Sequence, residues 1–321
     1  MLPHIRITGS GILFRSDKNM NIIDFAAGTE KMINPMDVGT THHMQKKLCK
    51  LPKWFQRKIV TSAAEKADKM GFVVEPYAFF LFYEIKDPKK VQKYLPDNFE
   101  PCESSIFEND PPKFYGITSI FRVHTSAFWG ARAEFYVVAK DKNTGLVSWI
   151  ILDYVSDTIG YDNKNGLRSP EANNAIITTT CEGDFLADIT RNRDSRRLKC
   201  VASLKNPKMR ALNEKLWIEG NTSIAYSDEL SGFNGDLFSL TFLPREMKEA
   251  WEIPLKDVKV AEISWFPAAM GGELSGAACF PFAQHMLSDS PGRCTNYCSV
   301  SELTAAAEKI NFRELKTFSS K

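Results

Sequence analysis

The sequence predicts a mainly β (α+β) protein, with antiparallel strands around one core and helices at the edges. From about residue 73 onwards, apolar segments of strand length follow one another with few helical patterns between them. Residues typical of turns separate these segments, as at 143–145, 163–166 and 191–195. Many short strands joined by hairpins are typical of an antiparallel barrel or sandwich. At 321 residues, of which 43% are hydrophobic, the chain is long enough to bury a sizeable core.

The N-terminal part is expected to be helical. Residues 41–70 show a helical pattern that is interrupted at Pro52 and ends at Gly71. Eight lysines and arginines stand in this segment against only Glu65 and Asp68. Its apolar side consists of Trp54, Phe55 and Ile59. A basic amphipathic helix can lie on an acidic membrane surface, but such helices more often pack on their own protein with a solvated outer face. We expect the second arrangement here.

The central part divides into strands. The run at 77–85 is apolar almost throughout and predicts a buried strand. Asp87 and Pro88 then begin a short helix that ends at Pro96. The further strand candidates are 114–124, 132–140, 146–156, 174–181, 185–189, 198–204, 215–226, 236–242 and 258–266.

The C-terminal segment predicts another helix. Ser299 stands three residues before Glu302, which is the spacing of a capping box, and the helix is expected to run to about residue 316. We therefore divide the chain into a partly helical N-terminal extension (1–72), a β domain (73–290) and a C-terminal helix (291–321).

The composition argues against several classes of protein. The formal net charge is only +2, which does not support a nucleic-acid partner. No run reaches the ~18 apolar residues that a membrane-spanning helix needs, and the N-terminus lacks the pattern of a signal peptide. The seven cysteines are odd in number and scattered, which favours free thiols in a reducing compartment. We expect a cytoplasmic protein without a membrane span, and the sequence leaves a homo-oligomer open.

Motifs for metal, cofactor and serine chemistry are incomplete. Cys294, Cys298 and His285 lack a second cysteine pair for a zinc site. The glycines in 271–276 stand at the wrong offsets for a hydrolase nucleophile, and GSG at 9–11 lacks the third glycine of a dinucleotide-binding turn. We therefore expect no metal and no cofactor.

A basic cluster lies between two predicted strands. It consists of Arg191, Arg193, Arg196, Arg197 and Lys199. Such a cluster is suited to an anionic cofactor or substrate, although a solvated hairpin tip is the more common explanation.

A series of segments that begins at Tyr77 follows the order of a known family. The first reads YAFFLFYEIKDPKKVQKYLPDNFEP, and FYGITSIFRVH, SAFWGA, RAEFYVVAKDKNTGLVSWIILDYVSD and PLKDVKVAEISW follow it. Over roughly residues 73–266 these segments resemble the acetoacetate decarboxylase-like family. The resemblance implies a cone- or barrel-like antiparallel β structure that encloses a pocket.

The resemblance also implies a pair of lysines, one of which forms a Schiff base with a keto acid. A second cation and a dry pocket keep such an amine deprotonated. The matching stretch here reads KNGLRSPEANNAII, in which Glu171, Asn173 and Asn174 follow Pro170 and no lysine pair is present. The nearest lysine, Lys164, lies in a Gly/Asn-rich turn. Because asparagine cannot form an imine, we expect either another reaction or binding alone.

The pocket carboxylate of the family is matched best by Glu134. On strand 132–140, Glu134 and Tyr136 share the polar face, for which an exposed surface is the alternative. Thr118, Arg122 and His124 share one face of strand 114–124, and a lone histidine is often only a structural hydrogen-bonding group. We expect Glu134 to act as acid or base, with Asn173 and Asn174 polarising a carbonyl or carboxylate. The expected substrate-binding residues are Thr118, Arg122, His124 and Tyr136.

The sequence thus predicts a divergent acetoacetate decarboxylase-like protein. If it is an enzyme, it is a lyase that acts on a small keto or carboxylic acid without Schiff-base chemistry. The alternative is a non-catalytic binding protein for a small lipophilic ligand. A third interpretation is an interaction protein whose basic N-terminal helix docks on a partner or membrane surface.

Overall fold

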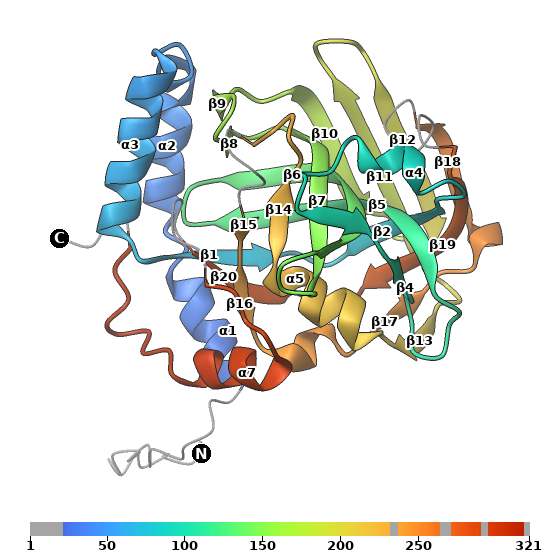
Figure 1. Cartoon of the computed structure of the whole chain (residues 1–321). Helices are drawn as coiled ribbons and strands as arrows, with labels where there is room; N and C mark the ends of the chain where they lie inside the picture. Colours follow the sequence, from blue (N-terminus) through green and yellow to red (C-terminus); the bar gives the residue numbers. More distant parts are fainter. Residues whose placement is uncertain (1–21, 232–236, 264–270, 290–294, 318–321) are drawn as a thin grey trace, which may run out of the picture.

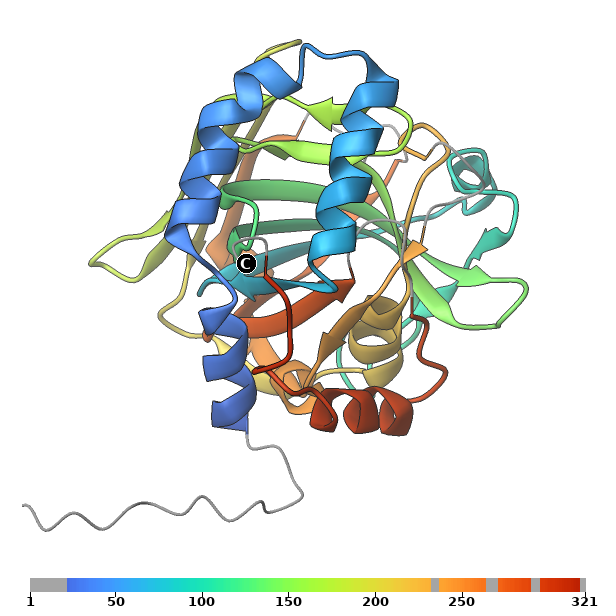
Figure 2. The ribbon, with the colours of Figure 1, turned by 90° about the vertical axis from the view of Figure 1, so that its left-hand side faces the viewer.

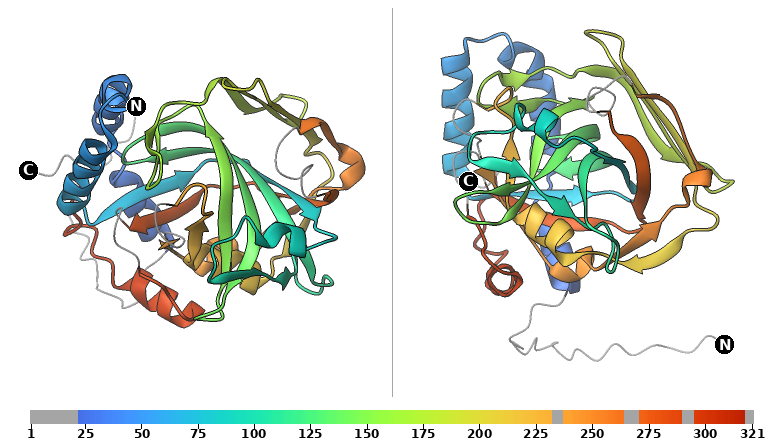
Figure 3. Two further views of the ribbon diagram at one scale, coloured as in Figure 1. Left: turned by 45° about the horizontal axis from the view of Figure 1, so that its top comes forward. Right: turned by 45° about the vertical axis from the view of Figure 1, so that its right-hand side comes forward.

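The computed structural model describes residues 22–231, 237–263, 271–289 and 295–317. Over these ranges the protein is mainly β, with a large curved sheet, a smaller sheet against one face and helices at the periphery (Figures 1 and 3). This confirms the predicted fold class. The GSG motif at 9–11 lies outside the described residues.

The large sheet has a central path of nine strands. In order they are β13 (Lys208–Ala211), β17 (Glu249–Glu252), β19 (Glu273–Phe280), β2 (Ala78–Glu84), β5 (Lys113–Thr125), β6 (Trp129–Asp141), β7 (Val147–Ser156), β14 (Ile224–Tyr226) and β15 (Leu237–Phe238). Pairing off this path are β1 (Lys69–Val74), β3 (Phe99–Pro101), β4 (Glu103–Ser104), β16 (Leu240–Phe242) and β20 (Gln284–Asp289).

Two features of this sheet correct the sequence-based prediction. The sheet is mixed, because β14 runs parallel to β7 while the other described neighbours pair antiparallel. Its end strands, β13 and β15, do not pair with each other, so the described strands form no closed barrel.

The smaller sheet comprises β10 (Ala172–Thr179), β11 (Asp184–Arg191), β12 (Arg197–Ser203) and β18 (Val258–Ile263). Buried residues alternate with partly exposed ones along β11 and β12, as expected for a sheet with one face against a core. Phe185 of β11 stacks on Phe79 of β2 with the ring centroids 4.6 Å apart. A separate hairpin is formed by β8 (Gly160–Asp162) and β9 (Gly166–Arg168).

The helical elements are short apart from those of the N-terminal part. They are α1 (Ile22–Lys31), α2 (Pro35–Leu48), α3 (Lys53–Lys66), α4 (Lys89–Gln92), the π-helical turn η1 (Lys215–Glu219), α5 (Gly220–Thr222), the 3-10 turns η2 (Pro244–Met247) and η3 (Leu255–Asp257), and α7 (Val300–Glu308). The predicted capping of α7 is confirmed, because the Glu302 amide donates to Ser299 Oγ at 3.2 Å. The helix ends at Glu308, earlier than expected.

The two faces of β5 and β6 belong to different cores. One face packs against an aromatic cluster that includes Trp149, Trp217 and Phe280. The other face packs against the smaller sheet, with Ile120 and Phe135 at the contact. Which face a side chain occupies therefore decides which environment it enters.

Two local predictions were wrong. Gly71, expected to end a helix, lies in β1. A Cβ added at this position would come within 2.9 Å of Met32 Cβ, so glycine allows α1 and the turn after it to lie close to β1. Residues 215–226, predicted as one strand, form η1, α5 and β14. Asn213 Oδ1 accepts the Leu216 amide at 3.2 Å, a helix-start contact that the apolar run concealed.

Helix α3 packs on the β8–β9 hairpin, as predicted for the 41–70 segment (Figure 2). The predicted apolar side does not make this contact, because Trp54 is 68% exposed and Phe55 is 38% exposed. The buried Gln56 amide makes the central contact. Its Oε1 accepts the Leu167 amide at 2.7 Å, and its Nε2 donates to the Leu51 carbonyl at 2.7 Å. The Gln56 side chain thus connects α3 to the turn before it and to the β8–β9 hairpin.

The contact between His285 and Glu30 of α1 predicts that the stability of the protein depends on pH. His285 lies between Glu246 of η2, at 2.9 Å from Nδ1, and Glu30 of α1, at 3.7 Å from Nε2. Burial would lower the pKa of His285, but the two carboxylates raise it above its ordinary value. A histidine pKa raised by folding stabilises the protein fully below its unfolded-state pKa of about 6.5, and this stabilisation is lost as the pH rises through the folded-state pKa.

We therefore expect His285→Gln to lower the free energy of unfolding at acidic pH, and to lower it less in alkaline solution. Urea unfolding at a series of pH values checks this. The exposed His43→Gln is the control, with an unchanged pH profile expected. A His285→Gln effect that grows as the pH rises would contradict the assignment.

Candidate functional site

Three polar side chains of β6 lie together in the interior. Arg132, Glu134 and Tyr136 alternate along the strand, so they share the face that points to the aromatic cluster. Arg132 Nε donates to Glu134 Oε1 at 2.6 Å, and the Tyr136 hydroxyl donates to Oε2 of the same carboxylate. Arg132 is 8% exposed and Glu134 is 7% exposed. The alternative of an exposed surface is therefore wrong, because this face of the strand carries a buried ion pair.

The electrostatics of this group follow from its burial. Burial alone would lower the pKa of Arg132, but Glu134 and neighbouring tyrosines raise it above its ordinary value. The pKa of Tyr136 is also raised, first by burial and then by the Glu134 carboxylate. Arg132 is thus held as a cation and Tyr136 as a neutral hydrogen-bond donor.

Tyr154 connects this group to a second one. It lies on β7 directly across from Glu134. Two guanidinium groups lie over its ring, with Cζ of Arg132 at 4.4 Å and Cζ of Arg168 at 4.2 Å from the centroid. Burial raises its pKa to about 12, although the two arginines oppose this shift. We call Arg132, Glu134, Tyr136, Tyr154 and Arg168 the Tyr154 site.

A glycine allows the approach of the β8–β9 hairpin to Tyr154. A Cβ built on Gly160 would lie 2.6 Å from the Tyr154 hydroxyl oxygen. Gly160 pairs with Arg168 across the hairpin, so the same hairpin carries the second arginine to the ring.

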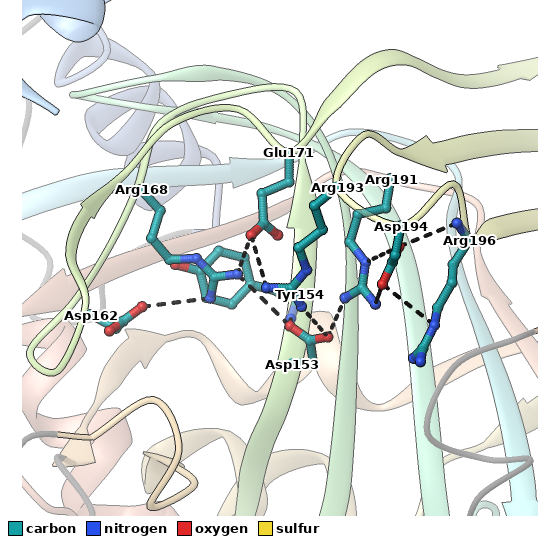
Figure 4. A network of polar contacts seen from close by, with 9 residues as sticks. All are labelled: Asp153, Tyr154, Asp162, Arg168, Glu171, Arg191, Arg193, Asp194 and Arg196. Carbon is teal, nitrogen blue, oxygen red and sulfur yellow. Dashed lines mark hydrogen bonds and ion pairs between the residues drawn. The ribbon is translucent and has the colours of Figure 1, made fainter. Parts of the chain in front are cut away.

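An ion-pair network extends from Arg168 (Figure 4). Arg168 contacts Glu171 at 2.5 Å, Asp162 at 3.5 Å and Asp153 at 3.9 Å. Arg191, which is 2% exposed, bonds to Asp153 at 2.6 Å. Each buried arginine therefore faces at least one carboxylate, as burial of a charge requires.

The remaining members of the basic cluster lie further out. Arg193 contacts Asp153 at 3.7 Å and Arg196 contacts Asp194 at 3.4 Å, and both arginines are exposed. Arg197 pairs with Asp188 of β11. The predicted basic hairpin tip is thus partly solvated, while the buried Arg191 forms an ion pair with Asp153.

Several buried polar atoms around Tyr154 have no hydrogen-bond partner among the described residues. They are the Tyr154 hydroxyl, Asp162 Oδ2, Arg168 Nη1 and Glu171 Oε2. An unsatisfied buried polar atom costs about 1–3 kcal/mol, so several in one place indicate a position where a bound polar molecule would be stabilised. Burial also raises the pKa of Asp162.

The structure separates the predicted site residues. Glu134 and Tyr136 are in direct contact, but Thr118, Arg122 and His124 lie on the opposite face of β5. The reason is register: Ser119, and not Thr118, is the β5 residue opposite Glu134. Thr118 is buried towards the smaller sheet, and Arg122 Nη1 donates to the Ile177 carbonyl at 3.4 Å.

The two asparagines lie on β10 of the smaller sheet. Asn173 is exposed, beside a register irregularity between Ala172 and Ala175. The side chain of Asn174 lies outside the described residues. Their predicted role in polarising a carbonyl stays a prediction.

Sequence reasoning missed Arg132, Tyr154, Asp162, Arg168 and Glu171 as a group. Arg132 was detectable, because it stands two residues before Glu134 on the same strand face. The others come from β7, β8, β9 and the turn after it, and only the hairpin geometry brings them together.

His124 belongs to a different feature, a pocket of about 430 Å³ between α2 and the turn that joins β5 to β6. Its lining residues are Ile33, Pro35, Val38, Gly39, His42, His124, Ala127, Phe128, Trp129, Thr158 and Ile159. Glu75 connects two of these lining residues, because it bonds to His124 Nε2 and accepts the Trp129 indole N–H at 3.2 Å. The Phe128 ring lines this pocket, and its centroid lies 5.8 Å from Arg132 Cζ, so the pocket lies beside the Tyr154 site.

The described residues contain no group of three potential metal ligands. The six cysteines in these ranges are all free thiols. No helix in the described part of the chain has the length and apolar character needed to cross a bilayer.

Comparison with known proteins gives similarity at the level of fold. No family model matches the sequence, and no curated protein matches it. The fold is similar to the crystal structure of acetoacetate decarboxylase from Legionella pneumophila, at 12% identity and a TM-score of 0.44, over 71% of this chain and 88% of that one. It is also similar to a second acetoacetate decarboxylase structure, at 11% identity and a TM-score of 0.40, over 68% and 87% of the two chains. Both belong to the family that the sequence segments resemble.

Proposed function

We propose that this divergent acetoacetate decarboxylase-like protein binds a small carboxylic or keto acid at the Tyr154 site. One observation carries the proposal. The buried Arg132 guanidinium uses Nε for Glu134, and no hydrogen bond to the described residues engages its two terminal nitrogens. Planar, paired N–H groups of this kind match the two oxygens of a carboxylate.

The surroundings favour a small polar ligand. The Tyr154 hydroxyl supplies a further donor that has no hydrogen-bond partner among the described residues, and Arg168 Nη1 faces Asp162 Oδ2 at 3.5 Å without hydrogen-bond geometry. Phe128 lies against Arg132 and helps to keep water from it. In such a low-dielectric site, hydrogen bonds to a charged group are stronger than in water.

Acid–base chemistry fits the same residues. When a β-keto acid loses carbon dioxide, the C–C bond breaks and its electron pair moves onto the ketone oxygen as an enolate. The Tyr154 hydroxyl is suited to stabilise that oxygen. Glu134, bonded to Tyr136, is the carboxylate proposed to take a proton from solvent water and deliver it to the carbon. None of these steps needs an imine.

The first test uses Tyr154→Phe. The ring stays beside the guanidinium groups and the lost hydroxyl has no hydrogen-bond partner among the described residues, so we expect the free energy of unfolding to change by no more than about 0.5 kcal/mol. Affinity for the acid should fall up to about tenfold, which is the value of one hydrogen bond. Thermal unfolding with and without short keto acids measures both effects. A destabilisation above about 2 kcal/mol would show that the hydroxyl is bonded within the protein.

The second test concerns the imine. No lysine is buried in the described part of the chain. Lys164 donates to the Asp228 carbonyl at 3.0 Å, and the pKa of Lys140 is raised by its hydrogen bond to Glu100. We expect borohydride reduction in the presence of acetoacetate to give no lysine adduct by mass spectrometry. A single adduct that disappears when that lysine is changed to alanine would overturn the non-imine mechanism.

The pocket between α2 and the β5–β6 turn favours a second candidate, a binding protein for a lipophilic ligand. Its walls are mostly apolar, with His42, His124 and Thr158 among the polar side chains. Such a composition is typical of sites for apolar small molecules. Binding of a neutral apolar compound that is lost on Val38→Trp, but not on the paired change Arg132→Met with Glu134→Gln, would support this candidate.

A further inference from the structure

The α2–α3 hairpin carries an uninterrupted positive charge. From residue 38 to residue 64 the sequence contains no aspartate or glutamate. The cations in this stretch are Lys46, Lys47, Lys50, Lys53, Arg57 and Lys58. All six are exposed, and no ion pair among the described residues neutralises any of them.

The docking of α3 keeps these charges at the surface. Lys53 Nζ donates to the Lys164 carbonyl at 3.1 Å, and Arg57 Nη2 donates to the Asn163 carbonyl at 2.8 Å. Together with Gln56 they fix one side of α3 on the β8–β9 hairpin. Because a carbonyl group carries no net charge, these partners leave the positive charges of Lys53 and Arg57 uncompensated. Helices α2 and α3 lie together on one side of the molecule (Figures 1 and 2).

Two aromatic side chains accompany the cations at the start of α3. Trp54 is 68% exposed and Phe55 is 38% exposed. The rings contact each other edge to face with centroids 5.4 Å apart. We call these two residues and the six cations the basic-aromatic surface.

We infer that the basic-aromatic surface binds an anionic phospholipid membrane from the outside, without spanning it. Clusters of four to eight lysines and arginines on a helix are attracted to anionic lipid, and tryptophan favours the headgroup region. The edge-to-face contact partly covers the rings, which disfavours the base stacking typical of single-stranded nucleic acid. The net charge of the whole chain is only +2, so the attraction is local to this hairpin.

The effect of charge can be stated as a fold-change. A cation near an anionic membrane surface contributes ~1 kcal/mol, or about a fivefold change in partitioning. Replacing Lys46, Lys47 and Lys50 with glutamine should therefore weaken membrane binding about a hundredfold. Trp54→Ala should weaken it further. All four side chains are exposed, so the variants should fold normally, as circular dichroism can verify.

Sedimentation of the full chain with lipid vesicles tests the inference. We expect binding to mixed phosphatidylcholine–phosphatidylserine vesicles in low salt, and none to phosphatidylcholine alone. The matched control replaces Lys89, Lys205 and Lys309, which are exposed elsewhere, with glutamine and changes the net charge equally. It should bind almost as well as the wild type.

Three results would overturn the inference. They are no binding to the mixed vesicles, equal binding of the two triple variants, and tight binding to neutral vesicles. Tighter binding to an oligonucleotide than to the mixed vesicles, or dimerisation that the first triple variant abolishes, would assign the surface to another occupant and would also reject it.

Discussion

Arg132→Met is expected to destabilise the protein by about 3–5 kcal/mol, which is the usual cost of leaving a buried charge without its partner. The change removes the cation that bonds to Glu134 at 2.6 Å and leaves that carboxylate, 7% exposed, with the Tyr136 hydroxyl. It also removes one of the two guanidinium groups over the Tyr154 ring. Urea unfolding of the wild type and the variant measures the effect.

The double variant Arg132→Met with Glu134→Gln should recover most of this stability. A neutral amide has a much smaller desolvation cost than a carboxylate, and its oxygen still accepts the Tyr136 hydroxyl. Lys140→Met is the control on the same strand, because its ion pair with Glu100 is solvated and should matter little. If Arg132→Met is as mild as Lys140→Met, or if the double variant is no more stable than the single one, the pair is not buried as described.

The second large effect concerns ligand binding. The folded double variant should bind short keto acids about tenfold to a hundredfold more weakly than the wild type, because hydrogen bonds to a charged group contribute about 1.5–3 kcal/mol. Arg197→Gln is the matched control, since Arg197 is partly solvated and pairs with Asp188 of β11. Calorimetric titration measures the affinities. Equal affinities of the wild type and the double variant would show that Arg132 and Glu134 do not take part in ligand binding.

The strands that could be predicted from the sequence are those with apolar runs between clear turn residues. Strands β5, β6 and β7 were predicted to within three residues at each end, and Gly145, with φ of 75°, lies in the predicted turn between β6 and β7. Strand β19 was missed, because Ser275, Gly276 and Ala277 are weak strand formers. It is a strand because β2 and β17 pair with it on either side.

The site was predicted only in part, because it also depends on contacts between strands that the sequence of one strand does not show. Alternation along one strand correctly placed Glu134 and Tyr136 on a common face. Register between strands is not visible in alternation, so Thr118 was assigned to the same substrate although it faces the other core. Arg168 reaches Tyr154 through the β8–β9 hairpin, and no local pattern in the sequence records that contact.

The most direct test of the central claim compares an acid with its neutral counterpart. Acetoacetate and acetoacetamide differ in the carboxylate that Arg132 is proposed to bind, and calorimetric titration of the wild type with each isolates that contribution. We expect the acid to bind at least about tenfold more tightly than the amide, because a hydrogen bond from a cation to a carboxylate is about twice as strong as one to a neutral oxygen. We also expect this preference to disappear in the Arg132→Met, Glu134→Gln variant. Equal binding of the acid and the amide by the wild type, or an undiminished preference in the variant, would contradict the assignment of the Tyr154 site as a carboxylate-binding site.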